Sequence, residues 1–252
     1  MNPENFHFYK GVLSFSVVLP TYNEKDNIIP LMESIQKSVP EAEIVVVDDD
    51  SPDGTWKIVQ EFAAEKPNVR LLRRVDKKGL VSALNDGIAI AKGEIVGWMD
   101  CDLSMPPELY PEFLKKIDEG YDFVAGSRFV DGGGVEIISG SSDTAFSFLL
   151  SRFLNKFVQS FLGRDFKDYT SGFVAIRKKV LTEFPLRGDY GEYFIELAYR
   201  AKKKGYKLTE IPYLCRARTQ GISKTGTNLF QYLKRGVKYI FVTLRMKFSR
   251  TV

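Results

Sequence analysis

The chain has 252 residues, of which 44% are hydrophobic, and its formal net charge is +4 at pH 7. This length and composition suit one large folded domain, alone or with a small appendage, and exclude a disordered chain. The only histidine is His7 and the only cysteines are Cys101 and Cys215, which excludes histidine-based acid–base catalysis, His-ligated zinc and a disulfide framework. So few cysteines predict a reducing, cytoplasmic compartment.

Apolar runs and helical periodicities alternate through the first half of the chain. The apolar runs predict strands near Val17, Val45, Leu71, Ile95 and Phe123. The periodicities predict helices at residues 25–38, 55–64, 80–91 and 107–119. Four successive strand–helix units indicate an α/β fold, namely a three-layer α/β/α sandwich with a mainly parallel central sheet.

The regular alternation ends after Phe123, where glycine- and serine-rich loops begin. Further elements are predicted there: a helix at 145–162, a strand at 173–176, a helix at 192–204 and a strand at 207–211. No internal repeat and no long linker interrupts the chain. We therefore expect one domain at residues 1–228, followed by a C-terminal amphipathic helix within residues 229–252.

The predicted C-terminal helix, residues 229–248, is basic and amphipathic. Its apolar residues form one stripe: Phe230, Leu233, Val237, Ile240, Phe241, Leu244 and Phe248. From Ile211 to the end there are nine basic residues and no acidic one, while the rest of the chain has 27 basic and 32 acidic residues. Two interpretations stay open: the helix packs on the domain, or it lies in an anionic membrane interface.

The chain is not expected to span a membrane or to be secreted. No apolar run approaches the roughly 20 residues that cross a bilayer, and the N-terminus lacks the pattern of a signal peptide. We expect a peripheral protein at the cytoplasmic face of a membrane. Nucleic acid is not an expected partner, because no groove-reading motif is present.

Three predicted strands end in polar clusters. Asp100-Cys101-Asp102 follows one strand, residues 21–24 follow another, and the acidic segment 48–54 follows a third. In an open parallel sheet the carboxyl ends of the strands lie on one edge, where ligands bind, so we expect the clusters to converge. Two carboxylates one residue apart can hold a divalent cation, and the cation can hold phosphates.

Other interpretations of these segments are weaker. The acidic segment could be a turn that caps the next helix. It is not an EF-hand, because Pro52 interrupts it and Gln60 stands where that loop needs glutamate. The chain has no Walker loop, and the glycines after Asp131 do not have the spacing of a dinucleotide fingerprint.

Six segments in order carry a family resemblance: residues 20–24, 48–54, 100–107, 126–128, 168–173 and 218–224. Together they resemble the nucleotide-sugar glycosyltransferases of family 2, and within that family the branch that uses polyprenyl-phosphate acceptors. The resemblance covers residues 15–224 and implies a GT-A fold. Each segment alone is a weak signal, but the ordered set is specific.

The resemblance implies the site residues by position. Donor binding would involve Pro20, Tyr22, Glu24, Val47, Asp49, Asp100, Cys101, Asp102, Ser104, Arg218 and Lys224. The implied metal ligands, for Mg²⁺ or Mn²⁺, are Asp100, Asp102 and Ser104. The implied acceptor-binding residues are Arg128, Ser151 and Arg152. Asp102 and Arg128 are the implied catalytic residues.

The implied reaction is an inverting transfer of a hexose, mannose from GDP-mannose, to a polyprenyl phosphate such as dolichyl phosphate. A membrane surface and a membrane-protein partner subunit are the further implied partners. An acceptor phosphate has a second pKa of about 6, so it needs no catalytic base at neutral pH. The chain departs from this branch at Ser147, where an arginine is expected, and Arg152 is the candidate substitute.

Two alternatives remain. A related transferase could use another nucleotide sugar, such as UDP-glucose, and a hydroxyl acceptor. That reaction needs a carboxylate base, for which Asp189, Glu192 and Glu196 are the candidates. The other alternative is a non-catalytic subunit that binds a nucleotide sugar.

Overall fold

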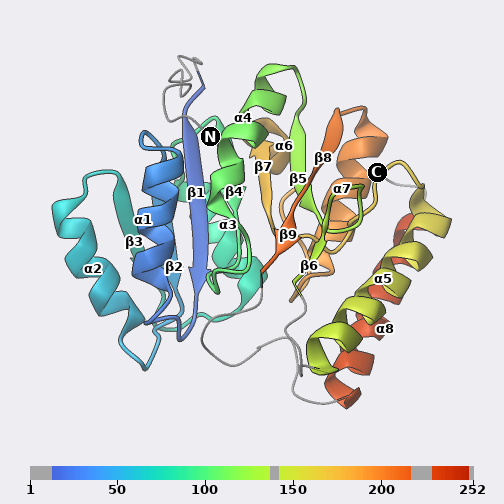
Figure 1. Cartoon of the computed structure of the whole chain (residues 1–252), viewed down its shortest axis with the longest axis horizontal. Coiled ribbons are helices and arrows are strands. Elements are labelled where there is room, and N and C mark those ends of the chain that lie inside the picture. Colours follow the sequence, from blue (N-terminus) through green and yellow to red (C-terminus); the bar gives the residue numbers. More distant parts are fainter. Residues whose placement is uncertain (1–12, 137–141, 217–228, 250–252) are drawn as a thin grey trace.

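A central seven-stranded sheet organises the protein (Figure 1). The computed structural model describes residues 13–136, 142–216 and 229–249. The strands follow the spatial order β3-β2-β1-β4-β7-β5-β8. Their bounds are β1 Phe15–Thr21, β2 Glu43–Asp48, β3 Val69–Arg73, β4 Ile95–Trp98, β5 Phe123–Ser127, β7 Val174–Arg177 and β8 Leu208–Pro212. Only β7 runs antiparallel to its neighbours in this sheet, so the prediction of a mainly parallel sheet is confirmed.

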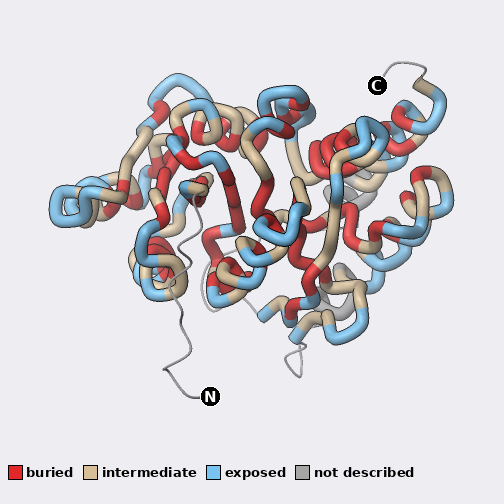
Figure 2. The backbone as a smooth tube through the Cα atoms, turned by 90° about the horizontal axis from the view of Figure 1, so that it is seen from above, coloured by how far each residue is buried: buried red, intermediate tan, exposed pale blue. Residues whose placement is uncertain are grey.

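Helices cover both faces of the sheet, which confirms the predicted three-layer sandwich. One face packs against α1 Ile28–Ser38, α2 Thr55–Glu65 and α4 Tyr110–Asp118. The other face packs against α3 Leu80–Ile90, α6 Lys178–Glu183 and α7 Tyr193–Lys204, with α5 Ser142–Leu162 and α8 Leu229–Phe248 beside them. Figure 2 shows buried stretches along the sheet and exposed ones on the outer turns of the helices.

Burial on two faces explains why the strands are continuous apolar runs rather than alternating ones. In β1, Val17 and Leu19 belong to the core under α1 and α4, whereas Val18 belongs to the core under α3. All three side chains are fully buried. Alternate residues of a strand point to opposite faces, so a strand covered on both sides has no solvated position.

The register of the strands brings the carboxyl ends of β1, β2 and β4 together. Thr21 pairs with Asp48 at the ends of β1 and β2, and Val18 pairs with Trp98 at the end of β4. Strand β1 runs parallel to both β2 and β4. The polar segments after these three strands therefore start from the same edge of the sheet, as predicted.

Several elements differ from the sequence prediction. A small sheet of β6 Gly134–Val135 and β9 Leu214–Cys215, and the helix α6, were not predicted. The helix predicted at 107–119 begins as the 3₁₀ turn η2 Pro107–Leu109 and continues as α4. Two-residue strands and a six-residue helix are too short to give a periodic signal. The two cysteines are free thiols.

The C-terminal helix α8 packs on the domain and also exposes an apolar side. It lies beside α5 (Figure 1) and contacts α7. Val242, Thr243 and Met246 are buried against the domain, while Val237 and Phe241 are each 64% exposed. In the described part of the chain, no helix has the length and apolar character needed to cross a bilayer. In this structure α8 thus packs against α5 and α7 and leaves part of its apolar stripe exposed.

Gly97 in β4 provides a test of how tightly the sheet packs. A Cβ atom at this position would lie 2.7 Å from the carbonyl oxygen of Val174 and 2.9 Å from the ring of Phe15. We expect Gly97→Ala to lower the free energy of unfolding by about 1–3 kcal/mol, because the backbone of the neighbouring strand must move. Urea denaturation measures this change.

Gly236→Ala in α8 is the matched control. No atom lies within 4 Å of a Cβ added at Gly236, outside its own helix. Alanine is also the better helix former, by about 1 kcal/mol. This variant should be at least as stable as the wild type, and equal losses in both variants would contradict the packing described for β4.

Candidate active site

Asp48 joins the ends of β1 and β2. Its carboxylate is fully buried and accepts hydrogen bonds from the hydroxyl of Thr21 at 2.8 Å and from the backbone N–H and hydroxyl of Ser51 at 2.8 and 2.7 Å. The next residue, Asp49, donates its backbone N–H to the carbonyl of Thr21 at 3.1 Å. Asp48 therefore has a structural role, and it places Asp49 at the edge of the sheet.

Asp49 forms a buried ion pair with Arg74, a residue that the sequence analysis did not identify. Arg74 Nε donates to Asp49 Oδ1 at 2.7 Å, Nη2 donates to the same oxygen, and the backbone N–H of Gly79 donates to Oδ2 at 2.7 Å. The other N–H groups of Arg74 meet Ser82, Asp86 and the carbonyl of Gly79. A carboxylate has about four acceptor positions. Three are taken, so Asp49 is rigidly oriented and keeps one for a ligand.

Asp100 and Asp102 follow β4 at the same edge. Asp100 is exposed, whereas Asp102 is 6% exposed and accepts the backbone N–H of Ser104 at 3.1 Å. The backbone of Leu103 has a left-handed φ of 63°, which turns the chain between Asp102 and Ser104. The thiol of Cys101 donates to the carbonyl of Pro20 at 3.5 Å, so this turn lies against the end of β1.

The donor atoms of this turn fit a hard divalent cation. Two carboxylates and a hydroxyl are oxygen ligands of the kind that Mg²⁺ and Mn²⁺ prefer. Within the described ranges, no group of three or more His, Cys, Asp or Glu side chains could hold a metal ion. A cation held by Asp100, Asp102 and Ser104 would therefore need further oxygens from water or from a phosphate ligand.

The remaining residues predicted for donor binding lie in different settings. Tyr22 follows β1, and the ammonium group of Lys78 lies 4.9 Å from the centre of its ring. Glu24 accepts a hydrogen bond from Asn27 at 3.0 Å. The side chain of Val47 is fully buried in the core. Arg218 and Lys224, which were also predicted to bind the donor, lie outside the described residues.

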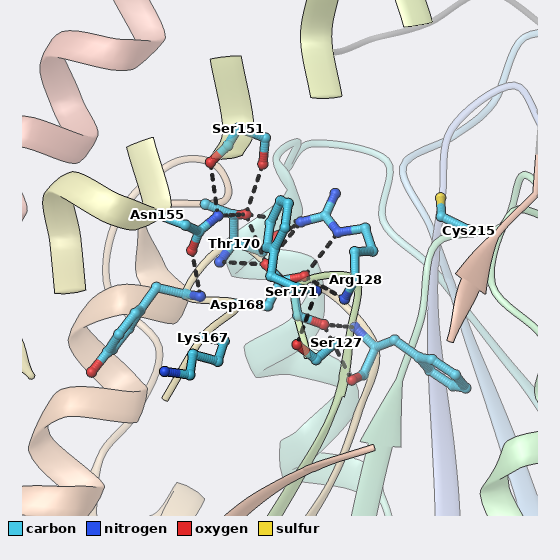
Figure 3. Close-up of polar contacts among 12 residues, drawn as sticks. Ser127, Arg128, Ser151, Asn155, Lys167, Asp168, Thr170, Ser171 and Cys215 are labelled. Carbon is cyan, nitrogen blue, oxygen red and sulfur yellow. Dashed lines mark hydrogen bonds and ion pairs between the residues drawn. The ribbon is translucent and has the colours of Figure 1, made fainter. Parts of the chain in front are cut away.

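A second polar group lies at the end of β5 (Figure 3). Asp168 is fully buried, and its two oxygens accept hydrogen bonds from Arg128 Nε at 2.8 Å and Nη2 at 2.9 Å. Burial alone would lower the pKa of Arg128, but the adjacent Asp168 carboxylate outweighs it and holds that pKa above its usual range. The guanidinium group is therefore a permanent, fixed cation.

The hydroxyl of Thr170 connects this ion pair to α5 (Figure 3). It receives hydrogen bonds from Arg128 Nη2 and Asn155 Nδ2, each at 2.8 Å, and lies 3.1 Å from the hydroxyl of Ser151. It donates to Asp168 Oδ1 at 3.0 Å. Arg128 and Ser151, both predicted acceptor-binding residues, are thus in one network, whereas the third, Arg152, is exposed on α5.

Sequence reasoning missed most of the residues that hold this network. Asp168 and Thr170 fall in the segment 168–173, which carried part of the resemblance, but no site role was assigned to them. Glu210 on β8 holds the start of this segment in place, because it accepts the backbone N–H groups of Lys167 at 2.6 Å and Asp168 at 2.8 Å. Burial raises the pKa of Glu210, so its contribution to stability falls as pH rises through that raised pKa.

Comparison of the sequence with known proteins identifies the family of this chain. Residues 16–184 match the sequence profile of Glycosyl transferase family 2. A dolichol-phosphate mannosyltransferase from Pyrococcus furiosus is 36% identical over 232 residues, covering 88% of this chain and 62% of the relative. A polyprenol monophosphomannose synthase from Mycolicibacterium smegmatis is 34% identical over 221 residues, covering 84% of this chain and 82% of the relative. The chain thus spans 62% of the length of the Pyrococcus protein.

Solved structures share the fold. Glucosyl-3-phosphoglycerate synthase from Mycobacterium tuberculosis, in a complex with Mn²⁺ and UDP, matches with a TM-score of 0.69 and 21% identity, over 94% of this chain and 81% of its own. A mannosyltransferase from Pyrobaculum calidifontis, in a complex with GDP-Man and Mn²⁺, matches with a TM-score of 0.65 and 20% identity, over 92% and 64%. At these identities the likeness concerns the fold alone, and it confirms the GT-A fold that the sequence resemblance implied.

Replacing the central hydroxyl of the second polar group tests its structural importance. We expect Thr170→Val to lower the free energy of unfolding by about 1–3 kcal/mol, because N–H groups of the partly buried Arg128 and the buried Asn155 lose an acceptor. Chemical denaturation measures the loss. The matched control is Thr182→Val, whose exposed hydroxyl bonds only the carbonyl of Lys178 in its own helix. A similar loss in both variants would show that the Thr170 network adds nothing specific.

Proposed function

The chain belongs to glycosyl transferase family 2, and on that premise we propose that it transfers a mannosyl group from GDP-mannose to a polyprenyl phosphate such as dolichyl phosphate. The names of two relatives, dolichol-phosphate mannosyltransferase and polyprenol monophosphomannose synthase, support this substrate pair. The observation that carries the proposal is the presence of two polar groups at one edge of the sheet. One is built on carboxylates, and the other on a partly exposed arginine, held by a buried carboxylate, that suits an anionic acceptor.

The carboxylate group receives the donor. Asp100, Asp102 and Ser104 would hold Mg²⁺ or Mn²⁺, which supplies positive charge to the departing diphosphate when bound. The one open acceptor position of Asp49 suits an N–H group of the nucleobase. Tyr22, with Pro20, provides an aromatic and apolar wall at the end of β1. These residues hold the donor so that its anomeric carbon faces the second polar group.

The arginine group receives the acceptor phosphate. Asp168 and Thr170 accept hydrogen bonds from Nε and Nη2 of Arg128. These bonds fix the direction in which Nη1 points. Ser151 adds a hydroxyl, and Arg152 supplies a cation in place of the arginine missing at position 147. A phosphate monoester with a second pKa of about 6 is dianionic at neutral pH. Its oxygen bonds to the anomeric carbon as the bond from that carbon to the diphosphate breaks, so the configuration inverts and no base is required.

A polyprenyl acceptor resides in a membrane, and α5 and α8 offer a surface for one. We name the following exposed residues the lipid-facing surface: Leu149, Leu150, Phe153, Val237, Ile240, Phe241 and Phe248. Among the described residues, only Val75 and Leu214 are other exposed large hydrophobic side chains. On α5 this surface lies beside Ser151 and Asn155, which reach Thr170. Residues 1–228 would thus form the catalytic domain, and α8 with α5 would dock it at the cytoplasmic face of a membrane.

Two of the three carboxylates that could act as a base toward a hydroxyl acceptor are held in ion pairs. Glu196, with a 6% exposed side chain, forms ion pairs with Arg187, Arg200 and Arg245. Asp189 forms an ion pair with Lys238 on α8. Glu192 is buried, and its Oε1 accepts the backbone N–H of Asp189 at 3.0 Å, whereas its Oε2 has no hydrogen-bond partner among the described residues. The ion pairs of Glu196 and Asp189 favour the phosphate acceptor over a hydroxyl acceptor that uses either of them as a base. Turnover distinguishes the enzyme from a non-catalytic donor-binding subunit.

Transfer to lipid is the direct test. Purified protein is incubated with Mn²⁺, a polyprenyl phosphate in detergent and either radiolabelled GDP-mannose or UDP-glucose, and the lipid is extracted. We expect label in the organic phase from GDP-mannose, and about 100-fold less with Asp102→Asn, which weakens the cation site. The control Asp165→Asn removes an exposed ion pair with Lys202 and should keep full activity. Absence of lipid label from both donors would refute the proposal.

Vesicle binding tests the lipid-facing surface. We expect Phe241→Asp to weaken flotation with vesicles that contain anionic lipid by about tenfold, because burial of a phenylalanine side chain contributes about 1.5–3 kcal/mol. The control Val75→Asp changes an apolar residue that is 57% exposed on the loop between β3 and α3, and it should bind like the wild type. Equal binding of both variants and the wild type would exclude this surface as the docking site.

A further inference from the structure

The loop between β3 and α3 carries two adjacent lysines in different settings. Lys77 donates to both oxygens of Asp86 at 2.8 Å, which holds it against α3. Lys78 is exposed and lies over the ring of Tyr22, 4.9 Å from its centre. Within the part of the chain that the structure describes, Lys78 makes no ion pair. Two lysines that look equivalent in the sequence thus have different partners, Asp86 for Lys77 and Tyr22 for Lys78.

The loop is anchored to the donor part of the site. Gly79 donates its N–H to Asp49 Oδ2 at 2.7 Å, and its carbonyl accepts Arg74 Nη2 at 3.1 Å. The φ of Gly79 is +124°, a conformation that residues with a side chain rarely adopt. The backbone next to Lys78 is therefore fixed by the same Asp49–Arg74 pair that orients the predicted base-binding carboxylate.

The contact between Lys78 and Tyr22 crosses the end of β2. In the sheet, β2 lies between β3 and β1. Lys78 comes from the loop after β3 and Tyr22 from the segment after β1. The lysine side chain therefore reaches over the strand end that carries Asp48 and Asp49. This position is beside the region in which the donor nucleotide is proposed to bind.

The charge balance at this edge of the sheet favours a cation at position 78. The end of β2 and the segments after β2 and β4 contribute six carboxylates at this edge: Asp48, Asp49, Asp50, Asp53, Asp100 and Asp102. The two nearby arginines are already committed, since Arg74 is buried against Asp49, and Arg73 pairs with Asp50 and stacks over Trp56. A nucleoside diphosphate adds further negative charge. Lys78 is the cation of this loop that is bound only by a weak contact to an aromatic ring.

We propose that Lys78 positions the donor by binding a phosphate oxygen of the nucleoside diphosphate, and that it leaves the Tyr22 ring to do so. A charge-assisted hydrogen bond to phosphate is stronger than an exposed cation–π contact, so the exchange is favourable. The movement also uncovers one face of Tyr22 for the nucleoside. This inference rests on the proposed function, and it adds a residue to which the family resemblance gave no role.

Calorimetric titration with GDP and with guanosine, both in the presence of Mn²⁺, tests the proposal. We expect Lys78→Met to raise the Kd for GDP about tenfold, as the loss of one hydrogen bond to a charged group predicts. The Kd for guanosine, which has no phosphate, should change less than about twofold. Lys78→Arg should restore most of the affinity for GDP. Because the interaction is ionic, the difference between the wild type and Lys78→Met should shrink as salt is raised.

Lys77→Met is the matched control, with the same substitution one residue earlier. Its ammonium group is held by Asp86, so we expect its Kd for GDP to stay within about twofold of the wild type. The thermal midpoints of the Lys78 variants should equal that of the wild type, because Lys78 is exposed. Unchanged GDP binding in Lys78→Met, or an equal loss for guanosine, would overturn this inference alone. A wild-type protein that binds GDP but transfers no sugar would refute only the proposed function.

Discussion

Burial of both faces of the central sheet is the constraint on which the rest of the structure depends. The strands in the middle of the sheet carry apolar side chains on both faces, as Val17, Val18 and Leu19 of β1 show. Polar groups therefore occur where the strands end, and the parallel order of β2, β1 and β4 brings three of those ends to one edge. The place of the candidate site follows from this topology, because the carboxyl edge is where backbone and side-chain polar groups of neighbouring strands can meet a ligand.

Two arginine–carboxylate pairs, each with a buried carboxylate, organise the two parts of the site. Asp49–Arg74 joins the ends of β2 and β3, and Asp168–Arg128 joins the end of β5 to the segment before β7. The cost of removing both charges from water largely offsets their attraction, so such pairs contribute little net stability. Their effect here is on orientation. The groups that would face a ligand are held in place before it arrives, which reduces the ordering that binding requires.

Helix α5 connects the chemistry of the site to the surface of the protein. Ser151 and Asn155 reach Thr170 on one side of this helix, and Leu149, Leu150 and Phe153 are exposed on another. The helical repeat of 3.6 residues lets one segment serve both purposes. A lipid acceptor could thus remain in a membrane below α5 and α8 while its phosphate lies beside Arg128.

The sequence by itself determined the alternation of strands and helices, the mainly parallel sheet and the polar segments at its edge, because periodicity and residue chemistry are local properties. It did not determine the direction of β7, which depends on pairing with β4 and β5. Nor did it distinguish Arg73 from Arg74, although one is exposed over Trp56 and the other is buried against Asp49. The same holds for Lys77 and Lys78. Only the tertiary structure decides between such neighbours, because their partners lie on strands and helices that are distant in the chain.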